Sequence, residues 1–224
     1  SKYDAHTLQG EFIFPKKIDF KHSFFFDTPF TQVSLMGINS ANGDSPSDTT
    51  WPATNNDFSV YAVRDQVNSA NVYFQLTSSV YAVDLKSPTF RGVYDNEKWN
   101  LAVRVKPKKY PYANFVSGST NKYTVEFYGV NHNYDSKQNE FSLSKDLTTT
   151  QGENFLKGNK RVYAGARRQN NTGSLLHNCD ALISSVRYWD SYLSDSEISG
   201  SDKEQSQFPY MKLQFSECWS SSPS

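Results

Sequence analysis

Short runs in which apolar and polar residues alternate recur along this chain. Four clear runs are DFSVYAVRD, NVYFQLTSS, KWNLAVRVK and KYTVEFYGV, which begin at residues 57, 71, 98 and 122. A period of two places successive side chains on opposite faces of a β-strand, and β-branched and aromatic residues favour that conformation. Turn-forming stretches such as NGDSP and SGS separate the runs. The pattern predicts many short antiparallel strands and therefore an all-β sandwich or jelly roll of two sheets.

Helical patterning is scarce by comparison. The best candidate is a turn or two at 194–199, where Ser194 is a plausible N-cap and Glu197 follows three residues later. This spacing is that of a capping box. It comes directly after an alternating run that ends in Tyr188 and Trp189. We therefore expect a closing strand followed by a short helical turn near the C-terminal end.

The length and composition fit one large sandwich domain. The chain has 224 residues, and although only 37% are hydrophobic, its 16 Phe and 14 Tyr supply bulky side chains that fill a core efficiently. We predict a single domain over residues 1–216 and a Ser-rich tail or linker over 217–224. The two cysteines, Cys179 and Cys218, either form one bridge that pins this tail or remain two thiols.

Charge and hydropathy narrow the range of partners. The chain carries 23 basic and 23 acidic residues. This balance gives no electrostatic reason to expect nucleic acid as a partner. No stretch approaches the roughly 18 consecutive apolar residues of a membrane helix, so we expect no membrane insertion. The sequence also begins without a charged-then-apolar leader, and we expect a mature product or a piece of a larger protein.

Catalytic motifs are absent from the sequence. It has no glycine-rich phosphate loop and no GxSxG elbow, and its histidines, His6, His22, His132 and His177, lack metal-binding spacing. Jelly-roll glucanases place two carboxylates on one strand in an E-x-D-x-x-E motif. Glu11, Glu126 and Glu140 have no second carboxylate at such a spacing. We therefore predict that the protein is not an enzyme, although carboxylates from distant strands could still meet.

Calcium is the one cofactor that the loops suggest, and we otherwise expect none. Ca²⁺ takes several oxygen ligands. Two polar stretches offer them: one contains Asn39, Asn42, Asp44, Ser45 and Asp48, and the other contains Asn131, Asn133, Asp135 and Glu140. Neither has the spacing of an established ion-binding loop, and such residues are also ordinary turn formers.

Aromatic side chains in loops are the candidates for sugar recognition. Trp51 ends the first polar loop, and Tyr110 and Tyr112 belong to the segment KPKKYPYANF. Rings with polar neighbours are typical of ligand sites. Lys106, Lys108 and Lys109 make this segment locally basic, which would suit an acidic polysaccharide. The alternative is a solvated lysine-rich tip whose tyrosines pack on one another.

Several segments together resemble laminin-G-like domains, which have the concanavalin A-like lectin and glucanase fold. They are FIFPKK, TPFTQVSLMGI, FSVYAVRD, VYDNEKWNLAVRVKP, YTVEFYGVN, RVYAGARR and ISSVRYWDSYLSDSEI, in that order. Three of them are similar to modules in large structural proteins of marine tailed phages. The resemblance implies a virion or extracellular surface location, with other structural subunits as partners and a cell-surface glycan as a further candidate. It transfers no calcium or sugar residue to this chain.

Three functions follow as hypotheses. The leading one is a non-catalytic module of a larger virion or extracellular structural protein that serves adhesion or assembly. The second is a free-standing carbohydrate-binding lectin that uses Trp51 and the 106–115 segment. The third is a glycoside hydrolase of the jelly-roll class. Because jelly rolls host all three, the choice has to come from a site and not from the fold.

Overall fold

The computed structural model describes residues 5–16, 31–40, 56–67, 69–110, 120–133, 136–171 and 173–199, and all structural statements below refer to these. The elements are β1 (His6–Phe14), β2 (Gln32–Ser40), β3 (Phe58–Arg64), β4 (Val72–Ser78), β5 (Val83–Lys86), β6 (Glu97–Pro107), β7 (Tyr123–Asn133), β8 (Ser136–Leu147), α1 (Thr149–Lys157), β9 (Lys160–Ala164), β10 (Arg167–Arg168), the 3₁₀ turn η2 (Gln169–Asn171), β11 (Leu175–His177), β12 (Leu182–Trp189) and α2 (Asp195–Ser199).

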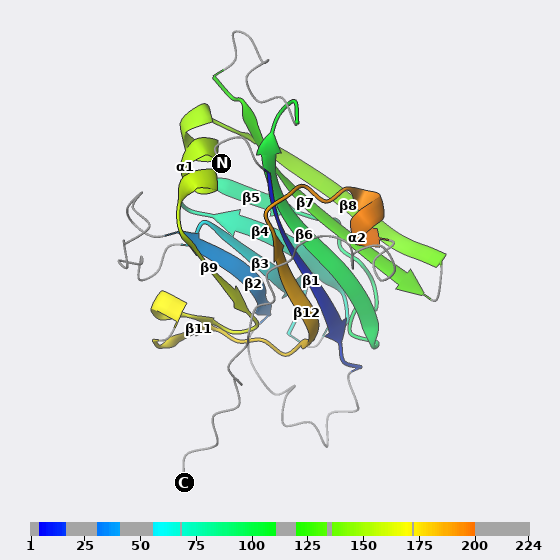
Figure 1. Ribbon diagram of the computed structural model, residues 1–224. Helices are drawn as coiled ribbons and strands as arrows, with labels where there is room; N and C mark the ends of the chain where they lie inside the picture. The colour runs from blue at the N-terminus through cyan, green and yellow to red at the C-terminus, as the bar shows by residue number, and fades with distance from the viewer. Residues whose placement is uncertain are drawn as a thin grey trace.

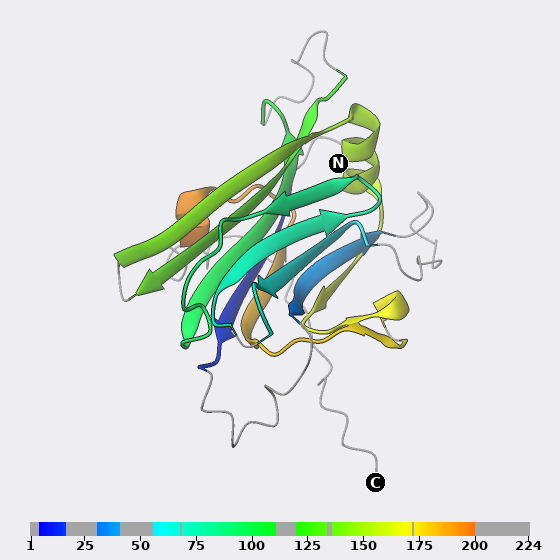
Figure 2. The ribbon, with the colours of Figure 1, turned by 180° about the vertical axis from the view of Figure 1, so that it is seen from behind.

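Two five-stranded antiparallel sheets face each other. The first sheet has the order β12-β1-β6-β7-β8 and the second has the order β5-β4-β3-β2-β9 (Figures 1 and 2). A small hairpin of β10 and β11 lies beside the second sheet (Figure 2). The predicted fold class, an all-β sandwich of two antiparallel sheets, is confirmed.

The alternation seen in the sequence decides which side chains enter the core. Along β6, Trp99, Leu101, Val103 and Val105 belong to the buried cluster between the sheets. Their neighbour Arg104 points to the opposite, outer face. The same period holds on β7, so both central strands of the first sheet have one apolar face and one largely polar face, as predicted.

An aromatic layer joins the two sheets. The ring of Phe74, from β4, lies 4.7 Å from Trp99 and 5.9 Å from Phe141 between centroids, both of which belong to the first sheet. Phe90 lies 4.7 Å from Trp99, and Phe127 meets Phe141 edge-on at 5.0 Å. These rings explain how a chain with modest hydrophobic content fills its core, because each buries a large area.

A glycine in β7 makes room for this layer. Gly129 pairs with Phe141 across β7 and β8. A Cβ atom at Gly129 would lie 2.2 Å from the Phe141 ring, closer than any real contact. The missing side chain therefore lets the Phe141 ring lie against the strand backbone.

The short helix at the C-terminal end is confirmed, and a longer one was missed. In α2, the Ser194 backbone N–H donates to Glu197 at 2.6 Å, and the Glu197 N–H donates to the Ser194 hydroxyl at 3.3 Å, which completes the predicted capping box. Helix α1 was not predicted. It has its own capping box between Thr148 and Gln151, and it buries Phe155 and Leu156 at one end of the sandwich (Figure 1).

Several sequence expectations concern residues beyond those described. Cys218 and the tail at 217–224 lie outside them. Cys179 is partly buried, with its sulfur 3.7 Å from the Ala181 carbonyl oxygen. The two alternatives for Cys179 and Cys218, one bridge or two thiols, stay predictions.

None of the helices in the part of the chain that the structure describes is both long enough and apolar enough to span a membrane.

Truncation of Phe74 tests the aromatic layer. Phe74→Ala should lower the free energy of unfolding by about 3–5 kcal/mol, because it removes the ring contacts that join the second sheet to the first and leaves a cavity. Val80→Ala, at an exposed turn position, should change it by less than about 0.5 kcal/mol. Urea unfolding followed by tryptophan fluorescence measures both variants. A cost at Phe74 no larger than that at Val80 would contradict the proposed role of the layer.

Candidate functional site

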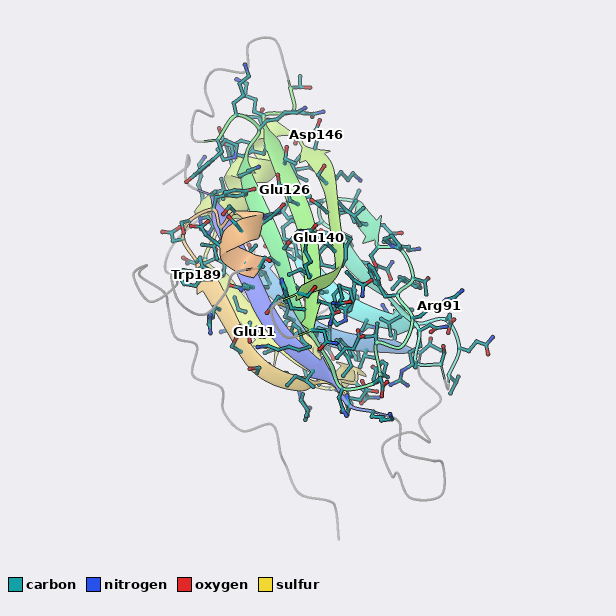
Figure 3. All side chains as sticks on the ribbon, turned by 90° about the vertical axis from the view of Figure 1, so that its right-hand side faces the viewer. Glu11, Arg91, Glu126, Glu140, Asp146 and Trp189 are labelled. Carbon is teal, nitrogen blue, oxygen red and sulfur yellow. The ribbon has the colours of Figure 1, made fainter. Side chains whose placement is uncertain are left out.

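The outer face of the first sheet carries an unusual concentration of charge. Alternation places Arg104 and Lys106 of β6 on this face, and Arg104 is the register partner of Glu126 on β7. Figure 3 shows Glu126, Glu140 and Asp146 over β7 and β8, beside α2. The same alternation that fills the core therefore brings these side chains together outside it.

The segment after β12 covers part of this face. A second apolar cluster consists of Ala102, Tyr128, Val130, Trp189, Leu193 and Ile198, all buried. Leu193 and Ile198 lie before and within α2, so this segment packs on the central strands β6 and β7. Figure 3 shows α2 between Trp189 and Glu126. The closing segment thereby fixes the position of the residues that precede α2.

Arg104 connects the sheet to that segment. Its side chain is only 1% exposed, and its Nη1 donates to the Leu193 carbonyl at 3.0 Å and to Asp195 at 2.6 Å. Its Nε lies 3.1 Å from Glu126 Oε2. A buried guanidinium is costly unless it is paired, so these partners hold one another in place.

Tyr192 lies over the charged pair formed by Lys106 and Glu126. Its hydroxyl donates to Glu126 Oε2 at 3.1 Å. The Lys106 ammonium donates to Glu126 Oε1 at 2.6 Å and lies 4.2 Å from the centre of the Tyr192 ring. Although burial lowers the pKa of the Lys106 ammonium, its hydrogen bond with Glu126 and the charge of that carboxylate raise the pKa above its ordinary value. Lys106 is therefore a cation at any physiological pH.

Tyr110 completes the arrangement. Its ring centre lies 5.5 Å from that of Tyr192 at an angle of 39°, and Tyr110 is 42% exposed. The Lys106 and Glu126 side chains are 19% and 16% exposed beside it. We call Lys106, Tyr110, Glu126 and Tyr192 the Tyr110 site. It combines one open aromatic ring with a neighbouring cation and carboxylate held at fixed positions.

The sequence predicted this site only in part. Of the three aromatic candidates, Tyr110 is at the site, whereas Trp51 and Tyr112 lie outside the described residues. Tyr192 was missed, because the segment that contains it was interpreted only as the close of the sandwich. That structural role is correct for Val186, which is buried in the core. The sequence feature that could have indicated Tyr192 is its position, between a predicted strand and a predicted capped helix.

The carboxylates of this face are already engaged. Glu126 has Arg104, Lys106 and Tyr192 as partners, and Glu140 accepts from Tyr128 and Lys137, each at 2.7 Å. The hydrogen bonds from Lys137 and Tyr128 hold the pKa of Glu140 below its usual value. A glycosidase needs one carboxylic acid that stays protonated near neutral pH. The absence of enzymatic activity stays a prediction.

The predicted calcium loops gain no support. In the second loop, Asn131 donates to the Lys98 carbonyl at 3.0 Å, and Glu140 is occupied as above. Asp135 lies outside the described residues, as does most of the first loop, in which Asn39 is the described member. Across the described part of the chain, no group of three or more His, Cys, Asp or Glu side chains is placed to hold a metal ion.

A second polar cluster, at the end of the sandwich near α1, consists of buried titratable groups. Asp57 is 5% exposed and accepts a hydrogen bond from the Ser40 hydroxyl. Burial raises the pKa of Asp57 to about 6, against the opposing effects of Ser40 and the charge of Lys160. His6 lies nearby: its ring contacts Phe155 of α1, and its Nε2 is 3.1 Å from Asp190.

Lys160 is the cation of this cluster. It lies 4.6 Å from the centre of the Phe155 ring and donates to the Gly158 carbonyl at 2.8 Å. Burial lowers the pKa of Lys160 to about 8, against the charges of Asp57 and Asp190. Both members of the pair are therefore costly to ionise. Asp57 is buried and Lys160 is partly buried, so the cluster offers no open binding surface, and the charge of Asp57 lowers stability.

Comparison with known proteins gives distant structural likenesses. No protein-family model and no curated protein matches the sequence. The carbohydrate-binding module CBM40 of a Ruminococcus gnavus IT-sialidase, bound to α2,3-sialyllactose, is similar at a TM-score of 0.39 and 10% identity, over 88% of this chain and 81% of that one. Another structure of the R. gnavus IT-sialidase CBM40 is similar at a TM-score of 0.38 and 11% identity, over 89% of this chain and 83% of that one. Neither transfers a residue or a ligand to this chain.

The Asp57 cluster predicts an unusual dependence of stability on pH. An unfolded Asp loses its proton near pH 4, whereas folded Asp57 keeps it to about pH 6. Between these values the unfolded state binds fewer protons, so the contribution of Asp57 to stability falls as pH rises and stays low above pH 6. Asp57→Asn should remove this loss of stability between pH 4 and 6. It should also raise the free energy of unfolding at pH 7 by about 1–3 kcal/mol.

Urea unfolding at pH 4, 5, 6 and 7 measures this effect. Asp84→Asn is the matched control, since Asp84 is an exposed residue of the second sheet, and it should leave the profile between pH 4 and 6 unchanged. If Asp57→Asn and Asp84→Asn have the same pH profile as the unaltered protein, Asp57 does not carry the proposed penalty.

Proposed function

We propose that this chain is a non-catalytic carbohydrate-binding sandwich module whose ligand binds at the Tyr110 site. The observation that carries the proposal is the open Tyr110 ring packed on Tyr192 beside the Lys106–Glu126 pair. A pyranose ring offers an apolar C–H face and a rim of hydroxyl groups. The site offers an aromatic face and both kinds of hydrogen-bonding partner.

The site has unused hydrogen-bonding capacity for such a ligand. A carboxylate has about four acceptor positions, two on each oxygen. In Glu126, Oε2 faces Arg104 and Tyr192, whereas Oε1 accepts from Lys106 alone. One position on Oε1 therefore remains for a sugar hydroxyl. Lys106 has three N–H donors, and its partners are Glu126 and the hydroxyl of Tyr192, so one donor remains.

Rigidity supports the same function. Tyr192 is held by Glu126 and by the packing of the adjacent Leu193 in the outer apolar cluster. Tyr110 in turn rests on Tyr192. A ring that is positioned before the ligand arrives loses little conformational entropy on binding. The site thus fits recognition that needs no rearrangement of the sheet.

The biological setting belongs to the same proposal. We place the module in a larger virion or extracellular structural protein, where it serves adhesion or assembly. The support is the sequence resemblance of the segments around β6, β7 and β12 to laminin-G-like modules of phage structural proteins. In such a setting, neighbouring subunits would cover other faces and leave the Tyr110 site open.

Two substitutions at one position test the binding site. Tyr110→Ala removes the aromatic face and should weaken glycan binding about tenfold or more, equivalent to about 1.4 kcal/mol. Tyr110→Phe keeps the ring and should retain binding within about threefold. A glycan array with neutral and anionic sugars identifies the ligand, and calorimetry measures the affinities of both variants and of the unaltered protein.

The outcomes separate the site from the function. Equal binding by Tyr110→Ala and the unaltered protein would place the ligand elsewhere. Failure to bind any printed glycan at tens of micromolar protein would overturn the carbohydrate-binding proposal. Thermal unfolding of each variant confirms that a lost signal reflects the site and not the fold.

An image of the parent assembly tests the setting. A structural module should bury about 1,000 Å² or more against neighbouring subunits in the particle, with Tyr110 outside that contact. A reconstruction by electron microscopy measures both. A particle in which Tyr110 is covered by a subunit would contradict adhesion through this face.

A further inference from the structure

The segment of β6 and β7 that carries the Tyr110 site has an excess of positive charge. From Glu97 to Glu126 the sequence contains no other acidic residue, although it contains six cationic ones: Lys98, Arg104, Lys106, Lys108, Lys109 and Lys122. The whole chain, by contrast, has no net charge. Positive charge is therefore concentrated on β6 and on the ends of the loop that joins β6 to β7.

Two of these lysines directly oppose each other. The Lys108 N–H donates to the Lys122 carbonyl at 2.8 Å, immediately beyond the last register pair of β6 and β7. Lys108 reaches Asp146, which also lies 3.4 Å from the Thr124 hydroxyl, so Lys108 lies on the outer face. Alternation from Thr124 places Lys122 on that face as well. Like charges opposite each other destabilise a strand pair.

The carboxylates of the face do not balance these cations. Around the Tyr110 site, Arg104 and Lys106 share Glu126, Arg104 also pairs with Asp195, and Lys108 pairs with Asp146. Lys109 and Lys122 form no ion pair within the described residues. On this face, the four cations Arg104, Lys106, Lys108 and Lys122 thus meet three carboxylates. Lys109 directly precedes the exposed Tyr110 in the chain.

We propose that the glycan bound at the Tyr110 site is anionic, with carboxylate or sulfate groups that contact Lys109 and Lys122. The inference rests on the proposed function and specifies its ligand class. Each ammonium gives a charge-assisted hydrogen bond to such a group, and the anion relieves the repulsion between Lys108 and Lys122. Tyr110 supplies the face on which the sugar ring stacks.

The size of the charge excess favours a glycan over nucleic acid. Nucleic acid is bound along an extended stripe of cations that neutralises many phosphates. Here two lysines without an ion pair among the described residues, Lys109 and Lys122, lie near one end of the first sheet. Their neighbours Lys106 and Lys108 are paired with Glu126 and Asp146, which Figure 3 shows on this face. This pattern suits a ligand whose negative charges are spaced by neutral sugar rings.

Calorimetry with ligands of matched length tests the proposal. The probes are a neutral hexasaccharide, a uronate hexasaccharide, a sulfated hexasaccharide and a single-stranded DNA dodecamer. The unaltered protein should bind at least one anionic hexasaccharide about tenfold more tightly than the neutral one at low salt, and 0.5 M NaCl should reduce this preference. The uronate and sulfated ligands distinguish which anionic group is recognised.

A pair of double variants separates local from total charge. Lys109→Gln/Lys122→Gln should abolish the preference for the anionic ligand and leave binding of the neutral one within about twofold. Lys86→Gln/Lys157→Gln removes the same charge from exposed lysines elsewhere and should keep the preference. An equal loss in both double variants would mean that only the total charge matters, and it would overturn the proposal.

The remaining outcomes are also decisive. Equal affinity of the unaltered protein for neutral and anionic hexasaccharides would overturn the anionic specificity while the carbohydrate-binding function stands. No binding of any hexasaccharide would overturn both. Binding of the DNA dodecamer as tightly as the anionic sugar would identify a general polyanion surface instead.

Discussion

The strict alternation of side chains along β6 and β7 is the constraint on which the rest of the structure depends. These strands lie at the centre of the first sheet, and they send Trp99 and Phe127 into the core while Arg104 and Glu126 lie outside. A shift of the pairing by one residue would exchange the two sets. It would place a guanidinium between the sheets and a tryptophan in water. The core therefore fixes the register, and the register fixes the site.

The outer face shows how a buried charge is used to position an exposed ring. Arg104 is held by Glu126, Asp195 and the Leu193 carbonyl, which joins the sheet to the segment before α2. Removing any one partner would leave part of this buried guanidinium unsatisfied, which is costly. Tyr192 lies within this segment, so its position follows from the Arg104 contacts. The orientation of Tyr110 then follows from Tyr192.

The sequence predicted the features that depend on local pattern and missed those that depend on pairing. The strands around Trp99 and Phe74, and the Ser194 capping box, follow from period and spacing within a few residues. Helix α1 was missed because its segment is mostly polar, and its capping box of Thr148 and Gln151 lies in a run of threonines. The meeting of Tyr110 with Tyr192 depends on the order of strands in the sheet, which no local pattern contains.

The two polar clusters of this protein differ in a way that bears on function. Burial raises the pKa of Asp57 although the Ser40 hydroxyl and the charge of Lys160 oppose this effect, so the charge of Asp57 costs stability. Glu126 is shared by Arg104, Lys106 and Tyr192, and its side chain is 16% exposed. A ligand at the Asp57 cluster would have to reach buried groups, whereas a ligand at the Tyr110 site meets groups that are already oriented and only partly dehydrated. Recognition on this fold is therefore best supported on the sheet face, beside the segment that closes the sandwich.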